Sequence, residues 1–186
     1  MYEVVSSRER FRGEIFRVVT DQIRLPDGEL AGRDVVHKFN AVGVAAIDDQ
    51  QRVVLIRQYR HAVGRYLWEL PAGLTDVDGE ELEATALREL EEETDLRAGR
   101  IDHLFDLYLS PGFTSETIRM FVARDLSDVP EYERHHRTAE EADMIVKRVP
   151  LAEAVDMILK GEITNASTAA AILALPHTLS AFLYSD

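Results

Sequence analysis

The sequence predicts an α+β protein in which a mixed β-sheet is covered by helices on both faces and is preceded by a small β segment. Short apolar runs typical of strands are mixed along the chain with longer stretches of helical periodicity, and such a mixture suits a sheet between helices. With 186 residues, 46% of them hydrophobic, the chain is long enough for one ordinary domain with a real core. We expect residues 1–40 to form the N-terminal β segment and residues 41–186 the main domain.

The first half of the chain contains predicted strands joined by polar turns. Within residues 3–40, the run Pro26-Asp27-Gly28 marks a tight turn between two strands. Residues 42–47 and 53–58 are apolar runs of strand length, and the polar residues 48–52 between them predict a turn.

The second half contains the predicted helices. A loop over residues 71–79 leads into a helix over about residues 80–94, and the polar, charged residues 127–143 predict a long loop. Asn165 or Ser167 is the expected cap of the last helix. The remaining predicted elements are strands at residues 101–109, 117–123 and 144–149 and helices at residues 151–160 and 167–183.

The composition limits the classes of partner. The formal net charge of −13 argues against nucleic acid or an anionic membrane as the main partner. A chain without cysteine cannot form a disulfide framework or a thiolate zinc site. Residues 1–13 contain no apolar signal core, and no run approaches the ~20 apolar residues of a membrane span. We therefore expect a soluble cytoplasmic protein. Because the protein is acidic, binding an anionic substrate would require cations at its site.

The predicted helix over residues 80–94 carries an unusual concentration of negative charge. Glu89, Glu92 and Glu93 fall within an arc of about 100° on its surface. They repel one another at these spacings, and they crowd the helix end at which the macrodipole disfavours anions. A hard divalent cation with oxygen ligands is a natural counter-ion, and Mg²⁺ suits best because it also bridges substrate phosphates. The helix alone leaves an ordinary solvated acidic face equally open.

The surrounding residues favour the metal interpretation, because residues 73–96 resemble the Nudix box. This pattern is Gly, five residues, Glu, seven residues, then Arg-Glu-apolar-x-Glu-Glu-x-Gly-apolar. Two departures stand out: six residues separate Gly73 from Glu80, and Asp95 replaces the late glycine. Asp95 closes the helix, where a left-handed conformation is wanted, and Asp is among the few residues besides glycine that tolerate it. The residues that match in register are Glu80, Arg88, Glu89, Leu90, Glu92, Glu93 and Leu96.

Within the Nudix family the chain resembles the ADP-ribose pyrophosphatase branch. Pro111 lies fifteen residues beyond Leu96, and residues 57–60, 68–73 and 161–166 also look like that branch. The resemblance implies an α/β/α sandwich and Mg²⁺-dependent hydrolysis of ADP-ribose to AMP and ribose 5-phosphate. A Nudix enzyme for another nucleoside diphosphate sugar, such as a GDP- or ADP-hexose, is the alternative. A non-catalytic ADP-ribose sensor is disfavoured, because the chain keeps every acidic box position and has no basic region.

The resemblance also implies a metal site. Two or three Mg²⁺ ions, with Mn²⁺ possible, would be held by Glu89 and Glu93, by Glu92 as a third carboxylate, and by the main-chain carbonyl of Ala72. Arg88 is expected to orient the neighbouring glutamates rather than to touch the substrate, and Glu80 is expected to share that structural role.

The general base in this branch comes from a loop outside the box. The matching loop here is residues 138–143, in which Glu141 is the first choice and Glu140 the second. A carboxylate suffices because a metal-bound water loses its proton easily. Without the resemblance, ordinary solvated loop charges would be the better interpretation of both residues.

Substrate contacts are implied by the resemblance as well. Arg60 would meet the pyrophosphate, since arginine pairs with phosphate in a bidentate manner, although a surface arginine at a strand end is the alternative. Phe16 would stack on the adenosine half or lie in the core, whereas Trp68 is expected to pack. The N-terminal segment would cross to a second subunit and form a domain-swapped homodimer. The implied substrate-binding residues are Arg60, Leu74, Pro111, Gly112, Glu116 and Arg33.

Overall fold

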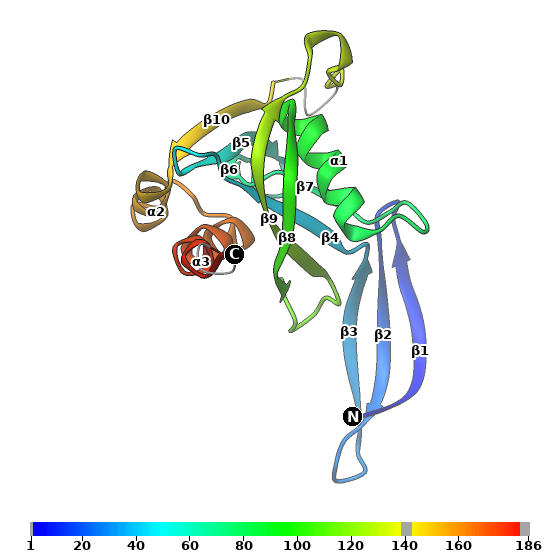
Figure 1. The fold of residues 1–186 in the computed structure, drawn as a ribbon. Coiled ribbons are helices and arrows are strands. Elements are labelled where there is room, and N and C mark those ends of the chain that lie inside the picture. The colour runs from blue at the N-terminus through cyan, green and yellow to red at the C-terminus, as the bar shows by residue number, and fades with distance from the viewer. Residues whose placement is uncertain (1, 139–142, 183–186) are drawn as a thin grey trace.

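The N-terminal residues form an antiparallel sheet that projects from the rest of the molecule (Figure 1). The structure is a computed structural model that describes residues 2–138 and 143–182, with side chains described as far as residue 178. The sheet has the order β1 (Glu3–Arg12), β2 (Phe16–Arg24), β3 (Leu30–Lys38). The predicted turn joins β2 to β3: the Gly28 N–H donates to the Leu25 carbonyl (2.9 Å), and Gly28 has a φ of 89°, which glycine adopts readily.

The main body is built on two further sheets. The first has the order β7 (Ala72–Leu74), β4 (Ala41–Ala46), β9 (Thr117–Asp128), β8 (Leu96–Tyr108). In this sheet β4 and β9 run parallel and the other neighbours antiparallel, so the prediction of a mixed sheet is confirmed. The second sheet has the antiparallel order β10 (Ile145–Pro150), β5 (Arg52–Arg60), β6 (Arg65–Glu69).

Helices cover both faces of the mixed sheet, as predicted. Helix α1 (Leu82–Thr94) lies on one side of it, and α2 (Leu151–Leu159) and α3 (Ala166–Phe182) lie on the other (Figure 1). Strand β4 explains this arrangement, because successive side chains of a strand point to opposite faces. Val42 and Val44 belong to the core cluster that contains Leu90 of α1, whereas Ala45 belongs to the cluster that contains Ile172 of α3.

The sequence predicted the residue at which α1 ends and the residue that caps the start of α3. Asp95 closes α1 in the predicted left-handed conformation (φ 58°, ψ 33°), and its N–H donates to the Glu91 carbonyl (2.9 Å). Asn165 caps α3, because its Oδ1 accepts a hydrogen bond from the Thr168 N–H (3.0 Å). No helix within the described ranges is long and apolar enough to cross a membrane.

Strands β6 and β7 and the short 3₁₀ helices η1 (His61–Val63) and η2 (Glu131–Glu133) were not predicted. The predicted loop over residues 71–79 contains β7, which pairs Ala72 with Gly43 of β4. Three residues are too few for a period of two to be visible in the sequence, so this strand is defined by its tertiary partner.

Candidate active site

Two adjoining hollows of about 360 Å³ each bring together residues from distant parts of the chain. They share Arg60 at the end of β5 and Ala72, Gly73 and Leu74 of β7. The first extends to Glu116 and to the N-terminus of α3, and the second extends to Arg88, Glu89 and Glu93 of α1. Two predicted metal ligands, Glu89 and Glu93, therefore border a hollow that adjoins the one lined by Glu116, and Arg60 and Leu74 border both.

Glu89 and Glu93 of α1 lie against the backbone of β7. A Glu93 carboxylate oxygen accepts a hydrogen bond from the Ala72 N–H (2.8 Å), and this glutamate is only 5% exposed. A Cβ placed on Gly73 would lie 2.0 Å from the Glu89 carboxyl carbon. The first glycine of the box is thus required by the close approach of Glu89, because any side chain at this position would collide with the carboxylate.

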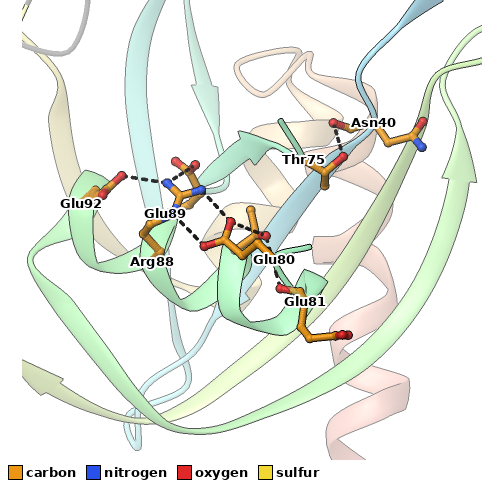
Figure 2. A network of polar contacts seen from close by, with 8 residues as sticks. Asn40, Thr75, Glu80, Glu81, Arg88, Glu89 and Glu92 are labelled. Atoms are coloured by element: carbon orange, nitrogen blue, oxygen red, sulfur yellow. Dashed lines mark hydrogen bonds and ion pairs between the residues drawn. The ribbon is translucent and has the colours of Figure 1, made fainter. Parts of the chain in front are cut away.

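Arg88 sits among the remaining acidic residues of the box (Figure 2). One of its nitrogens, Nη1, donates to Glu89 (2.8 Å) and to Glu92 (3.1 Å), and Nε donates to Glu80 (3.2 Å). The hydrogen bond to Glu80 is the main cause that raises the pKa of Arg88 above its ordinary value. In turn, hydrogen bonds from Arg88 and then from Thr85 lower the pKa of Glu80. The guanidinium thus offsets the repulsion that the sequence predicted within this helix.

These residues fit a hard divalent cation. Glu89 and Glu93 offer carboxylate oxygens at i and i+4, both line the hollow beside β7, and glycine at position 73 leaves room for the first of them. Mg²⁺ and Mn²⁺ prefer such oxygen donors. Glu92 is turned to Arg88 and does not line either hollow. Among the residues that the structure describes, no three acidic or histidine side chains are gathered as a metal cluster.

Arg60 is held at the junction of the two hollows by Glu69 of β6. Its Nε and Nη2 donate to one carboxylate oxygen of Glu69, at 3.0 and 2.6 Å. Glu69 is 2% exposed and also accepts hydrogen bonds from Gln58 (3.3 Å) and Asn165 (3.0 Å). Sequence reasoning did not identify Glu69 as a site residue. The signal was a lone acid inside the apolar run of residues 66–72, but nothing in the sequence showed what it contacts.

Glu116 lines the first hollow, where it forms an ion pair with Lys38 at the end of β3 (2.7 Å). Their side chains are 14% and 27% exposed, so the pair is largely shielded from water. Lys38 was also missed, because it lies 78 residues from Glu116 and the two segments meet only in the fold, where Val36 of β3 forms a bridge to Thr114.

Other predicted site residues lie away from the two hollows. Arg33 is in the projecting sheet and donates to the Gly32 carbonyl (2.8 Å). Pro111 and Gly112 are in an exposed turn after β8 and line neither hollow. Trp68 packs against the core cluster, as expected, whereas Phe16 is 38% exposed beside Phe11. The two predicted general bases, Glu140 and Glu141, lie outside the described residues.

Comparison with known proteins identifies the family that the fold and the box define. A sequence model of the NUDIX domain matches residues 37–171, and the chain belongs to the Nudix family. It is 44% identical to an ADP-ribose pyrophosphatase of Mycobacterium tuberculosis (strain ATCC 25618 / H37Rv), over 97% of this chain and 86% of the relative. It is also 34% identical to an ADP-ribose pyrophosphatase of Bacillus subtilis (strain 168), over 91% of this chain and 90% of the relative.

The fold is shared with a solved structure of an "ADP compounds hydrolase". The two superpose with a TM-score of 0.84 over 97% of this chain and 95% of the other. Since their sequences are only 23% identical, this likeness concerns the fold, and it confirms the predicted Nudix-type sandwich.

Proposed function

We propose that this protein hydrolyses the pyrophosphate bond of ADP-ribose to AMP and ribose 5-phosphate with the help of divalent cations. The observation that carries the proposal is that Glu89 and Glu93 of the box border one hollow together with Arg60, which also borders the adjoining hollow that Glu116 lines. The carboxylates of Glu89 and Glu93, which can bind a metal ion, therefore lie beside the guanidinium of Arg60, which can bind phosphate. The extent of the similarity to the two ADP-ribose pyrophosphatases supports the choice of substrate.

Arg60 binds the pyrophosphate in this proposal. The Arg60 side chain is 44% exposed and borders both hollows, so its guanidinium can meet a ligand that spans them. We assign the hollow that contains Leu74 and Glu116 to the terminal ribose. Pro111, Gly112 and Arg33 stay candidates for substrate binding on the strength of the family resemblance.

Glu89, Glu93 and Glu92, with the main-chain carbonyl of Ala72, are the proposed ligands of two or three Mg²⁺ ions, or of Mn²⁺. When bound, these cations neutralise the pyrophosphate and lower the pKa of a water molecule. Arg88 offsets the repulsion between the carboxylates and orients them through its contacts with Glu80, Glu89 and Glu92.

Glu141 is the proposed general base, and Glu140 is the second candidate. The base accepts a proton from the water that attacks one phosphorus, and the bridging P–O bond breaks as the other phosphate leaves. This assignment depends on the match of residues 138–143 to the loop that carries the base in the family.

We further propose that the protein is a cytoplasmic homodimer joined through residues 1–40. The projecting sheet exposes large apolar side chains, and a second copy would cover them: Val4, Val5, Phe11, Ile15 and Leu30 are each more than 40% exposed. Light scattering should give about twice the chain mass of 21.0 kDa. A monomer that forms in the Phe11→Glu variant would support this interface, and a wild-type monomer would refute it.

The metal-dependent reaction is tested by a matched pair of variants in α1. Glu89→Gln should lower kcat for ADP-ribose at least about a hundredfold while the thermal unfolding temperature stays close to that of the wild type. Glu83→Gln removes a charge from an exposed position of the same helix and should change kcat less than about twofold. Equal turnover in the wild type and Glu89→Gln would refute the metal site.

A further inference from the structure

We propose that Asn165 and Glu69 are positioning residues that fix the direction of the Arg60 guanidinium in the candidate active site. Through these two residues, the N-terminus of α3 fixes the orientation of Arg60, which lies far away in the sequence at the end of β5. This inference rests on the proposed function, in which Arg60 binds the pyrophosphate. It concerns residues that no part of that proposal uses.

Glu69 is a buried carboxylate. Its side chain is 3% exposed, and a buried carboxylate is stable only when its oxygens are paired and hydrogen-bonded. One oxygen, Oε2, accepts from Arg60 (Nε 3.0 Å, Nη2 2.6 Å) and from Gln58 (3.3 Å). The other, Oε1, accepts from Nδ2 of Asn165 (3.0 Å). The two carboxylate oxygens thus connect the arginine on one side with the asparagine on the other.

The Asn165 amide is held in one orientation by its hydrogen bonds. Its Oδ1 accepts from the Thr168 N–H (3.0 Å) and from the Ser167 hydroxyl (2.9 Å). Since these partners need an acceptor and Glu69 needs a donor, the hydrogen bonds determine which end of the amide faces which neighbour. The amide meets both needs at once from two separate atoms, Nδ2 as donor and Oδ1 as acceptor, whereas a carboxylate at this position offers acceptors only. An ordinary helix cap would accept a serine or an aspartate equally well.

The N-terminus of α3 is anchored beside the strand that bears Glu69. The Thr168 hydroxyl accepts a hydrogen bond from the Leu70 N–H (3.0 Å), and both residues are 2% exposed. The N-terminus of α3 is therefore fixed next to Glu69 by a contact that does not involve Asn165. Loss of the Asn165 donor should leave the helix in place and release only the carboxylate.

These contacts explain how Asn165 acts on a group that it does not touch. Arginine has a long side chain with many rotamers, and its planar fork binds phosphate well only when its direction is fixed. Two N–H groups of the fork are held by Glu69, whose own rotation is limited by the bond to Asn165. Without that bond, the carboxylate can turn about its last torsion and Arg60 can turn with it.

Asn165→Asp separates the two roles of Asn165. Aspartate keeps the acceptor for the helix cap, but it cannot donate to Glu69 and instead sets a second carboxylate against that of Glu69. We expect kcat/KM for ADP-ribose to fall about tenfold in this variant, since a lost hydrogen bond to a charged group has effects of this order. In the Arg60→Ala background the same substitution should cost less than about twofold, because the group on which it acts is absent. Thr178→Ala, which removes a hydrogen bond to Ala174 within α3, is the matched control and should leave kcat/KM unchanged.

The same double-mutant cycle of Asn165→Asp and Arg60→Ala is repeated with the dissociation constant of ADP-ribose as the readout. This constant is measured calorimetrically in EDTA, so the result does not depend on turnover. If Asn165→Asp causes a loss of kcat/KM or of affinity that becomes much smaller in the Arg60→Ala background, the inference is supported. Equal losses with and without Arg60 would overturn it and would leave Asn165 as a helix cap alone. If Asn165→Asp does not fold, Glu69→Gln replaces it in the same cycle. A wild type that binds but does not cleave would refute only the proposed function, and one that does neither would refute both.

Discussion

Arg137 forms an ion pair with Asp95 at the C-terminal end of α1, the helix of the box. Its Nη2 lies 2.5 Å from Oδ2 of Asp95, and its Nε donates to the main-chain oxygen of Glu92 (3.0 Å). Asp95 occupies the position at which the Nudix pattern has glycine, and it adopts the left-handed conformation that glycine would adopt. The departure from the pattern is therefore offset by an ion pair that glycine cannot make.

We expect Arg137→Ala to lower the free energy of unfolding by about 1–3 kcal/mol, because it removes two hydrogen bonds from a largely shielded charge. Asp95→Gly should cost less, since glycine removes a backbone penalty of about 1 kcal/mol at this residue. Urea unfolding measures both. Lys147→Ala, in an exposed pair with Glu153 at 3.7 Å, is the control and should stay within about 0.5 kcal/mol. A larger loss in Asp95→Gly than in Arg137→Ala would contradict this explanation.

The close approach of Glu89 to β7 makes Gly73 sensitive to any side chain. Gly73→Ala would bring a methyl group within 2.0 Å of the Glu89 carboxyl carbon, so the carboxylate must move. We expect a loss of about 1–3 kcal/mol in urea unfolding and a loss of ADP-ribose turnover. Gly32→Ala is a suitable comparison, because its nearest neighbour is the flexible end of Gln22 at 3.3 Å. Full activity in Gly73→Ala would show that the position of Glu89 is not critical.

The general base can be found by comparing two neighbouring glutamates. Glu141→Gln should lower kcat at least about a hundredfold without a comparable loss of Mg²⁺ binding, because it removes only the proton acceptor. Single-turnover rates and Mg²⁺ titrations followed by thermal unfolding distinguish these effects. If Glu140→Gln is the inactive variant, the base is its neighbour. If both variants are active, the base lies elsewhere.

Acid should destabilise the protein partly through Glu80. Hydrogen bonds from Arg88 and then Thr85 hold its pKa in the folded state below the ordinary value of 4.5. The unfolded chain therefore binds the proton first, so this contribution is complete above about pH 4.5 and is lost as the pH falls through the folded pKa. Urea unfolding between about pH 7 and 3 should show a smaller acid-induced loss in Glu80→Gln than in Glu83→Gln. Identical profiles for both variants would refute this role of Glu80.

The sequence predicted the parts of the site that lie in one continuous stretch. The box from Gly73 to Leu96 has a strict spacing that can be recognised in the sequence. The left-handed conformation of Asp95 could be predicted because Asp is one of the few residues besides glycine that tolerate a positive φ. Residues that meet from distant segments are not separated by any fixed number of positions, so no sequence pattern predicts their contact. Glu69 meets Asn165, 96 positions later in the chain, and Lys38 meets Glu116 in the same way, so the residues that hold Arg60 and line the first hollow became visible only in the fold.

The central claim is tested most directly by product analysis. Purified protein is incubated with ADP-ribose and with a panel of nucleoside diphosphate sugars in Mg²⁺, with EDTA as the control, and the products are separated by chromatography. We predict AMP and ribose 5-phosphate, formed fastest from ADP-ribose and abolished by EDTA. Faster cleavage of a GDP- or ADP-hexose would contradict the assigned substrate and keep the metal site. Tight binding of ADP-ribose without cleavage of any substrate would contradict the enzymatic function itself.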